Sequence, residues 1–108
     1  MDITLHKYHG AGNDFLLIDN RKDNIHLITE QIAHLCHRNF GIGADGLMLL
    51  ENDAQHDFKM VYYNSDGKQS TMCGNGGRCI VLFAHHLGII QNNTTFMAVD
   101  GVHQASIN

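Results

Sequence analysis

The sequence predicts an α+β fold in which a mixed, mostly antiparallel sheet curls around a central helix. Two observations lead to this prediction. Short segments with the alternating or apolar pattern of strands come in adjacent pairs, and a helical segment separates each pair from the next, giving the order β-β-α-β-β-α-β-β. The second helical segment, about 74–87, is apolar nearly all round in its middle, as expected of a helix that other elements surround.

The first strand pair lies near the N-terminus. Residues 3–7 alternate apolar and polar side chains as a half-buried strand does, and residues 15–19 form a short run typical of a fully buried strand. The glycines and polar residues of 10–14 predict a turn between them.

A helix is predicted over about 30–38, with Thr29 as its N-cap. The glycines within 41–43 end it. Its apolar face contains Ile32, Leu35 and Cys36.

The next strands are expected at 47–50 and 58–63, and the second runs into a reverse turn at 64–68. The long helix follows, and Gly88 supplies its C-terminal stop. Two final strands, 95–99 and 102–106, flank Asp100-Gly101, which is a strong signal for a two-residue hairpin turn.

Composition limits the possible classes of protein. With 44% hydrophobic and 17% charged residues, residues 1–108 are expected to form one globular domain. The net charge of −4 and the scattering of only seven Lys and Arg residues argue against binding of nucleic acid or of a membrane surface. No apolar run approaches the ~18 residues of a membrane span, and the N-terminus lacks a basic-then-apolar leader, so a cytoplasmic protein is expected.

The three cysteines differ in their surroundings. Cys36, Cys73 and Cys79 form an odd set without a CxxC pair, which predicts reduced thiols and neither disulfides nor a zinc site. Cys73 lies in a glycine-rich turn that leads into the second helix, where unpaired backbone N–H groups favour a thiolate and can also bind a carboxylate. We therefore expect Cys73 to be reactive and the other two to belong to the core.

Two further patterns argue against a cofactor or a metal. Residues 41–46 match G-x-G-x-x-G, but they follow a helix and precede a strand, the reverse of a dinucleotide fingerprint. This segment is either a plain turn or a ligand contact. His34 and His37 share a predicted helical face, and His85-His86 form a second pair, yet no third ligand accompanies them, so exposed histidines are expected.

Three asparagines are candidate ligand contacts. Asn13 and Asn64 lie in turns beside strands, and Asn75 lies at the predicted start of the second helix. Taken singly, each is common in a turn for conformational reasons. Together, their amides can donate and accept hydrogen bonds to an ammonium and a carboxylate without adding charge.

Sequence motifs spread in order over most of the chain resemble one known family. They occupy residues 7–15, 38–46, 63–67 and 72–79. Together they closely resemble diaminopimelate epimerase. Asn75 separates the chain from the related proline racemases, which typically carry histidine after Cys-Gly.

The resemblance implies a cofactor-independent isomerase that interconverts LL- and meso-diaminopimelate, an amino acid on the route to lysine and peptidoglycan. Two pseudo-symmetric domains of such an enzyme close over the substrate, and each offers one cysteine at the start of its central helix. By matching position, Cys73 resembles one catalytic cysteine. The residues that resemble substrate contacts are Asn13, Asn64, Gly74 and Asn75.

Two positions depart from the family pattern. Gly46 stands where the family often has glutamine, so only a backbone contact is possible there. Gly77 stands where the family usually has a larger apolar residue, which weakens the helix start slightly.

The resemblance covers the N-terminal half of such an enzyme, so the chain alone is expected to be inactive without its C-terminal domain. An apolar face left by that domain predicts a possible homo-oligomer. Three alternatives are open. The first is another cofactor-independent amino-acid racemase of the same fold. The second is a non-catalytic module that binds carboxylates or only packs on a partner. The third is a thiol hydrolase or peroxidase-type enzyme in which His9, the only histidine in a candidate loop, serves Cys73 as base.

Overall fold

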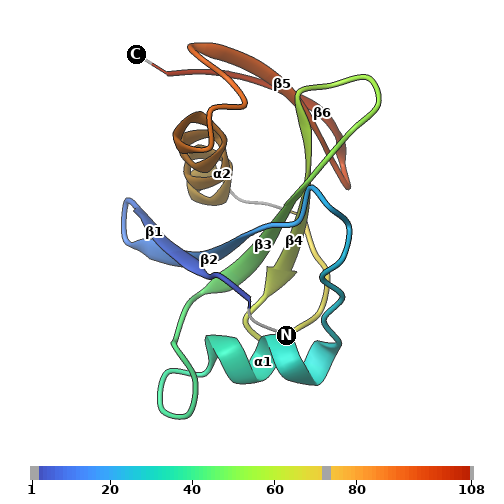
Figure 1. The fold of residues 1–108 in the computed structure, drawn as a ribbon. Helices are drawn as coiled ribbons and strands as arrows, with labels where there is room; N and C mark the ends of the chain where they lie inside the picture. Colours follow the sequence, from blue (N-terminus) through green and yellow to red (C-terminus); the bar gives the residue numbers. More distant parts are fainter. Residues whose placement is uncertain (1–2, 72–73, 108) are drawn as a thin grey trace.

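The computed structural model describes residues 3–71 and 74–107. Figure 1 shows a curled sheet that wraps around one helix, while the other helix lies against the opposite face of the sheet. The elements are β1 (His6–Gly10), β2 (Asn13–Asp19), α1 (Thr29–Cys36), β3 (Gly46–Glu51), β4 (Phe58–Asn64), α2 (Gly74–His86), β5 (Asn93–Ala98) and β6 (Gly101–Ser106). The predicted α+β class and the predicted element order are confirmed.

The sheet has six strands in the order β1-β2-β3-β4-β5-β6, so each strand pairs with its neighbours in sequence. The two connections that contain a helix, between β2 and β3 and between β4 and β5, join parallel strands. The other three pairs are antiparallel. Parallel neighbours need a crossover, which each helix supplies, and the sheet is therefore mixed but mostly antiparallel, as predicted.

The strands β2 and β3 are buried on both faces. Phe15, Leu17 and Met48 belong to the cluster that packs against α2, whereas Leu16 and Ile18 belong to the cluster that packs against α1. Successive side chains of a strand point to opposite faces, so a strand covered on both sides is apolar throughout. This explains why the sequence of β2 shows no alternation.

The helix α2 is the central helix that the sequence predicts (Figure 1). Its middle packs into the core through Ile80, Val81 and Phe83, whereas Leu82 is 39% exposed. Gly88 has a φ of 79° and follows the helix, so the predicted C-terminal stop is confirmed.

The first strand lies three residues later than predicted. The hairpin pairs Gly10 with Asn13, which leaves Ala11 and Gly12 as the turn, with φ angles of 42° and 100°. Positive φ at both turn residues matches the twist of a two-residue hairpin and sets this register. Asn13 consequently begins β2 and does not lie in the turn.

The limits of α1 also differ from the prediction. Thr29 is the first helical residue, and the N-cap is Ile28, whose backbone N–H donates to Gln31 Oε1 at 2.8 Å. The helix ends at Cys36, and His37 is already extended, with ψ of 125°. The following loop folds back on the helix end, where Ala44 N–H donates to the Cys36 carbonyl at 3.0 Å.

The last hairpin is shifted by one residue. Ala98 pairs with Gly101, so the turn consists of Val99 and Asp100, and the predicted turn Asp100-Gly101 is wrong. Gly101 instead opens β6 with a φ of 123°. Neither α1 nor α2 is long and apolar enough to cross a membrane, and the described part of the chain holds no other helix.

Candidate active site

The candidate site lies at one end of the sheet. In the pairing register, Phe15 of β2 is opposite Gly46 of β3, and Gly46 is opposite Asn64 of β4. Asn13, at the start of β2, and Asn64, at the end of β4, therefore lie toward the same end of the sheet. They are 51 positions apart in the sequence, and the parallel pairing of β2 with β3 together with the antiparallel pairing of β3 with β4 brings their strand ends together.

The start of α2 joins the same end. Asn75 Nδ2 donates to Asn13 Oδ1 at 2.7 Å. The hairpin also approaches the helix closely at Gly10, where an added Cβ would lie 3.1 Å from the Asn75 carbonyl oxygen and 3.3 Å from Cys79 Sγ. Two of the predicted contact residues, Asn13 and Asn75, are thus directly hydrogen-bonded to each other.

A network of charged side chains surrounds Asn13. Asp45 Oδ2 accepts a hydrogen bond from Asn13 Nδ2 at 3.0 Å. Arg38 donates to both oxygens of Asp14 at 3.1 and 2.8 Å and to Asp45 Oδ1 at 3.1 Å. Lys7 Nζ lies 3.2 Å from Asp14 Oδ2. These contacts connect β1, β2 and the loop before β3 next to the hydrogen-bonded pair Asn13 and Asn75.

The network keeps both carboxylates ionised. The Arg38 guanidinium, with help from Lys7 and the Asp45 backbone N–H, holds the pKa of Asp14 far below its usual range. The Asn13 amide is the largest cause of the lowered pKa of Asp45, and the Asp14 N–H and Arg38 add to it. Hydrogen bonds to a carboxylate favour its charged form.

The remaining predicted site residues have different positions. Asn64 is exposed, and its backbone closes the turn that follows β4, because its carbonyl accepts from Gly67 N–H and its N–H donates to the Lys68 carbonyl. Gly74 is exposed at the first position of α2. Cys73 lies outside the described residues.

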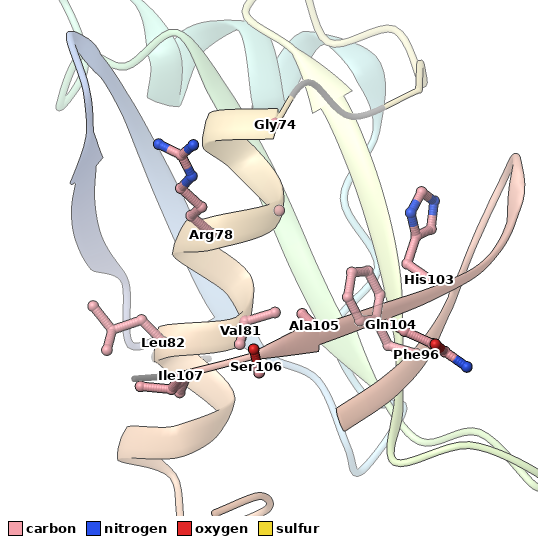
Figure 2. A pocket seen from close by; sticks show the side chains of 11 residues that line it. Gly74, Arg78, Val81, Leu82, Phe96, His103, Gln104, Ala105, Ser106 and Ile107 are labelled. Atoms are coloured by element: carbon pink, nitrogen blue, oxygen red, sulfur yellow. The ribbon is translucent and has the colours of Figure 1, made fainter. Parts of the chain in front are cut away.

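A groove of 380 Å³ runs between α2 and β6. Figure 2 shows Val81 and Leu82 of the helix across from Ile107, with Arg78 on the helix turn above. Gly74 lies at one end of the groove, but none of the three asparagines lines it. Of the predicted contacts, Gly74 therefore lines this groove, Asn13 and Asn75 are hydrogen-bonded to each other outside it, and Asn64 lies apart at the end of β4.

The other two cysteines are buried, as predicted. Cys36 and Cys79 are each 3% exposed. Burial raises the pKa of the Cys36 thiol to about 11, so it is protonated at neutral pH. A protonated, buried thiol cannot meet a substrate.

The two histidine pairs, His34 with His37 and His85 with His86, are exposed, as expected, but two details of the prediction are wrong. His34 and His37 do not share a helical face, because α1 ends between them, and His37 Nδ1 instead accepts from the N–H groups of Asn39 and Phe40. His9 lies in β1 opposite Asp14 and not in a loop. The described residues contain no group of three or more His, Cys, Asp or Glu placed to hold a metal ion.

Gly46 has little free space around it. An added Cβ would lie 2.8 Å from the Tyr62 ring and 2.8 Å from the Tyr63 carbonyl oxygen. A glutamine at this position therefore requires movement of β4 as well as of Tyr62. The departure from the family pattern at Gly46 is accompanied by a tyrosine that fills the space.

The charged network was not predicted from the sequence. Asp14, Arg38 and Asp45 lie within the motifs noted above, but they appeared there only as neighbours of glycines and asparagines. A usable signal was present: charged residues of opposite sign, beginning with Lys7, stand beside the turns that flank two adjacent strands. Their pairing depends on the β2–β3 register, which the sequence does not give.

Comparisons at the level of sequence agree on one family. The family model described as "Diaminopimelate epimerase" matches residues 5–106. A diaminopimelate epimerase of Flavobacterium psychrophilum is 65% identical over 111 residues, a match that covers 98% of this chain and 42% of that relative. The chain thus spans less than half the length of this curated relative.

Solved structures of low sequence identity share the fold. A PhzF-family phenazine biosynthesis protein of Bacillus anthracis aligns with a TM-score of 0.75 and 17% identity, covering 100% of this chain and 37% of that protein. A methylitaconate-delta-isomerase aligns with a TM-score of 0.73 and 10% identity, covering 100% and 35%. At such identities, the likeness concerns the fold alone.

Proposed function

The chain belongs to the diaminopimelate epimerase family, and from this premise we propose that it supplies one half of the active site of a cofactor-independent amino-acid epimerase. The substrate is diaminopimelate, and the reaction interconverts its LL and meso forms. Cys73 is one of two catalytic cysteines. Asn13, Asn64, Gly74 and Asn75 contact the substrate.

One observation carries the proposal: the hydrogen bond between Asn13 and Asn75 at the N-terminal end of α2, 2.7 Å long. It supports a pair of hydrogen-bonded amides, of which Asn75 is two positions after Cys73 in the sequence. Removing the Cα proton of an amino acid leaves negative charge on its carboxylate. The free N–H groups at the start of a helix stabilise such charge without a cofactor.

The second cysteine must come from beyond this chain. Inversion of a stereocentre requires a thiolate on one face to take the proton and a thiol on the other to return one, so the roles exchange with direction. Cys36 and Cys79 are buried in the two clusters of the core and are unsuited to this task. The relatives are more than twice as long as this chain, which leaves room for the partner cysteine in their remaining length.

The place of the reaction follows from its substrate. An epimerase acting on diaminopimelate serves the supply of lysine and of peptidoglycan precursors, and we propose a cytoplasmic site for it. The 108-residue chain by itself is expected to be inactive.

The test is exchange of the Cα proton. In the full-length protein that carries this chain, LL-diaminopimelate in deuterated water should gain deuterium at Cα, as measured by mass spectrometry. Cys73→Ala should reduce this exchange by at least about a hundredfold, because it removes an acid–base group. Cys36→Ala is the matched control, since Cys36 is buried in the core, and its exchange rate should stay near the wild-type value.

Two results would contradict the proposal. Exchange with proline and none with diaminopimelate would favour another racemase of this fold. Binding of diaminopimelate that survives Cys73→Ala, in a wild-type protein that exchanges no proton, would favour a binding module.

A further inference from the structure

Asp45 occupies a position that connects the loop after α1 to the proposed substrate contacts. It directly precedes β3, and its Oδ2 accepts from Asn13 Nδ2 at 3.0 Å and from the Asp14 backbone N–H at 3.2 Å. Its Oδ1 accepts from Arg38 at 3.1 Å. Each oxygen of this carboxylate therefore has a donor.

This contact fixes the orientation of the Asn13 amide. An ionised carboxylate only accepts hydrogen bonds, so the NH₂ group of Asn13, and not its carbonyl oxygen, must face Asp45. Arg38 and the Asp14 N–H, which also donate to Asp45, keep it ionised. The two ends of an amide group are thus distinguished here by chemistry.

The oriented Asn13 amide in turn fixes the orientation of the Asn75 amide. Because the Asn13 NH₂ group faces Asp45, its Oδ1 faces Asn75 and accepts from Asn75 Nδ2 at 2.7 Å. Asn75 is thereby held with its NH₂ group toward Asn13, which leaves its own Oδ1 for another donor. A flip of Asn13 would place two NH₂ groups against each other and break this arrangement.

We propose that Asp45 is a positioning residue that orients the Asn13 amide and, through it, the Asn75 amide, so that both present fixed donors and acceptors to the substrate. The inference rests on the proposed function, because the two amides matter for the reaction only if they contact substrate. The active part of Asp45 is the oxygen that accepts from Asn13. Its ion pair with Arg38 is partly exposed on both sides, with side-chain exposures of 57% and 41%, and such pairs contribute little.

Side-chain NMR of the ¹⁵N-labelled 108-residue chain tests the orientation directly. Asp45→Ala should move the NH₂ resonances of both Asn13 and Asn75 toward those of a solvated amide. Asp45→Asn should keep them near their wild-type positions, because the carbonyl oxygen of asparagine still accepts from Asn13. The control is Asp53→Ala: Asp53 holds a loop at the other end of β3 through the N–H groups of Gln55 and His56, and its loss should leave both resonances in place.

Kinetics of the full-length protein test the consequence. Asp45→Ala should raise KM for diaminopimelate roughly tenfold while kcat changes less than about threefold, as expected when contacts that bind substrate and transition state alike are weakened. Asp45→Asn should restore KM to within about threefold of wild type. A loss of fold alone would lower the amount of active enzyme and leave KM unchanged.

Several outcomes overturn the inference. Unchanged Asn75 resonances in Asp45→Ala would do so. An equal rise in KM in Asp45→Ala and Asp45→Asn would also do so, because it would assign the effect to the ion pair with Arg38. If the alanine variant does not fold, Asn13→Ala replaces it, and an unmoved Asn75 resonance there contradicts the relay. If the amide resonances move as predicted in Asp45→Ala but the full-length wild-type protein exchanges no proton, the positioning role is upheld and the proposed function is refuted.

Discussion

Asp14 shows how a single carboxylate links two strands and a loop. It is 8% exposed and accepts two hydrogen bonds from Arg38, and Lys7 lies within ion-pair distance. A carboxylate placed in this way is ionised in the folded chain at a pH where the unfolded chain would protonate it. The stability of the site thus depends on pH through a residue that is not itself a proposed substrate contact.

The pH dependence has a definite sign. Because folding lowers the pKa of Asp14, its contribution to the free energy of unfolding is complete above the unfolded value of about 4 and is lost as pH falls below it. Asp14→Asn should therefore lower the free energy of unfolding by roughly 1–3 kcal/mol at pH 7 and by less at pH 3. Urea denaturation at both pH values measures this.

The control for this measurement is Asp66→Asn in the exposed turn after β4. It should change the free energy of unfolding at pH 7 by no more than about 0.5 kcal/mol. If Asp14→Asn lowers the free energy of unfolding by the same amount at pH 7 and pH 3, the role assigned to the Asp14 charge is contradicted.

At the scale of elements, the site depends on how closely the β1–β2 hairpin approaches the first turn of α2. Gly10 makes this approach possible, because an added Cβ would lie 3.1 Å from a backbone oxygen of the helix. Gly76, on the helix, faces the sheet at a more ordinary distance, with Met48 Sδ and Phe15 Cζ each 3.7 Å from an added Cβ. The two glycines thus differ in what a methyl group would meet.

This difference predicts opposite effects of the same substitution. Gly10→Ala should lower the free energy of unfolding by about 1–3 kcal/mol, since it forces the hairpin away from the helix. Gly76→Ala should leave stability unchanged or raise it by up to about 1 kcal/mol, because alanine favours the helix and fits the space. The midpoints of urea denaturation of the two variants test this prediction. A shift of both midpoints in the same direction would contradict it.

At the scale of the molecule, the β5–β6 hairpin is joined to the rest of the sheet by a short ladder. The pairing of β4 with β5 contains only Phe58↔Phe96 and Lys59↔Met97 among the described residues. The rings of Phe58 and Phe96 stack at 4.8 Å with an angle of 6° between their planes, and both are 1% exposed. This aromatic contact therefore packs the two strands together at that junction.

Phe96→Ala should therefore loosen the hairpin before the rest of the fold. We expect a loss of about 3–5 kcal/mol in the free energy of unfolding, as is typical for removal of a buried ring. Hydrogen exchange measured by mass spectrometry should show faster exchange in β5 and β6 than in β2 and β3. Val99→Ala, at the hairpin turn and 60% exposed in the wild type, should leave exchange unchanged, and uniform loss of protection in Phe96→Ala would argue against a separate hairpin unit.

Local patterns in the sequence were sufficient for the class of fold, the number and order of its elements, the central helix and the burial of Cys36 and Cys79. Apolar periodicity and turn composition act over a few residues, so they are visible in the chain itself. The limits of the elements were less accurate, because pairing registers decided them. In the first hairpin, for example, the pairing of Gly10 with Asn13 moved the strand from 3–7 to His6–Gly10.

The sequence alone predicted the residues of the proposed site, namely a thiol at Cys73 and amides at Asn13, Asn64 and Asn75, and it indicated the family that the comparisons then showed. The tertiary structure was needed to show that Asn13 and Asn75 are hydrogen-bonded to each other, that Asp45 accepts from Asn13, and that Arg38 donates to Asp14. The physical reason is that these contacts join residues that are 24 to 62 positions apart. Such contacts form only once β2 and β3 have paired and α2 has packed on them, and no local pattern encodes that register.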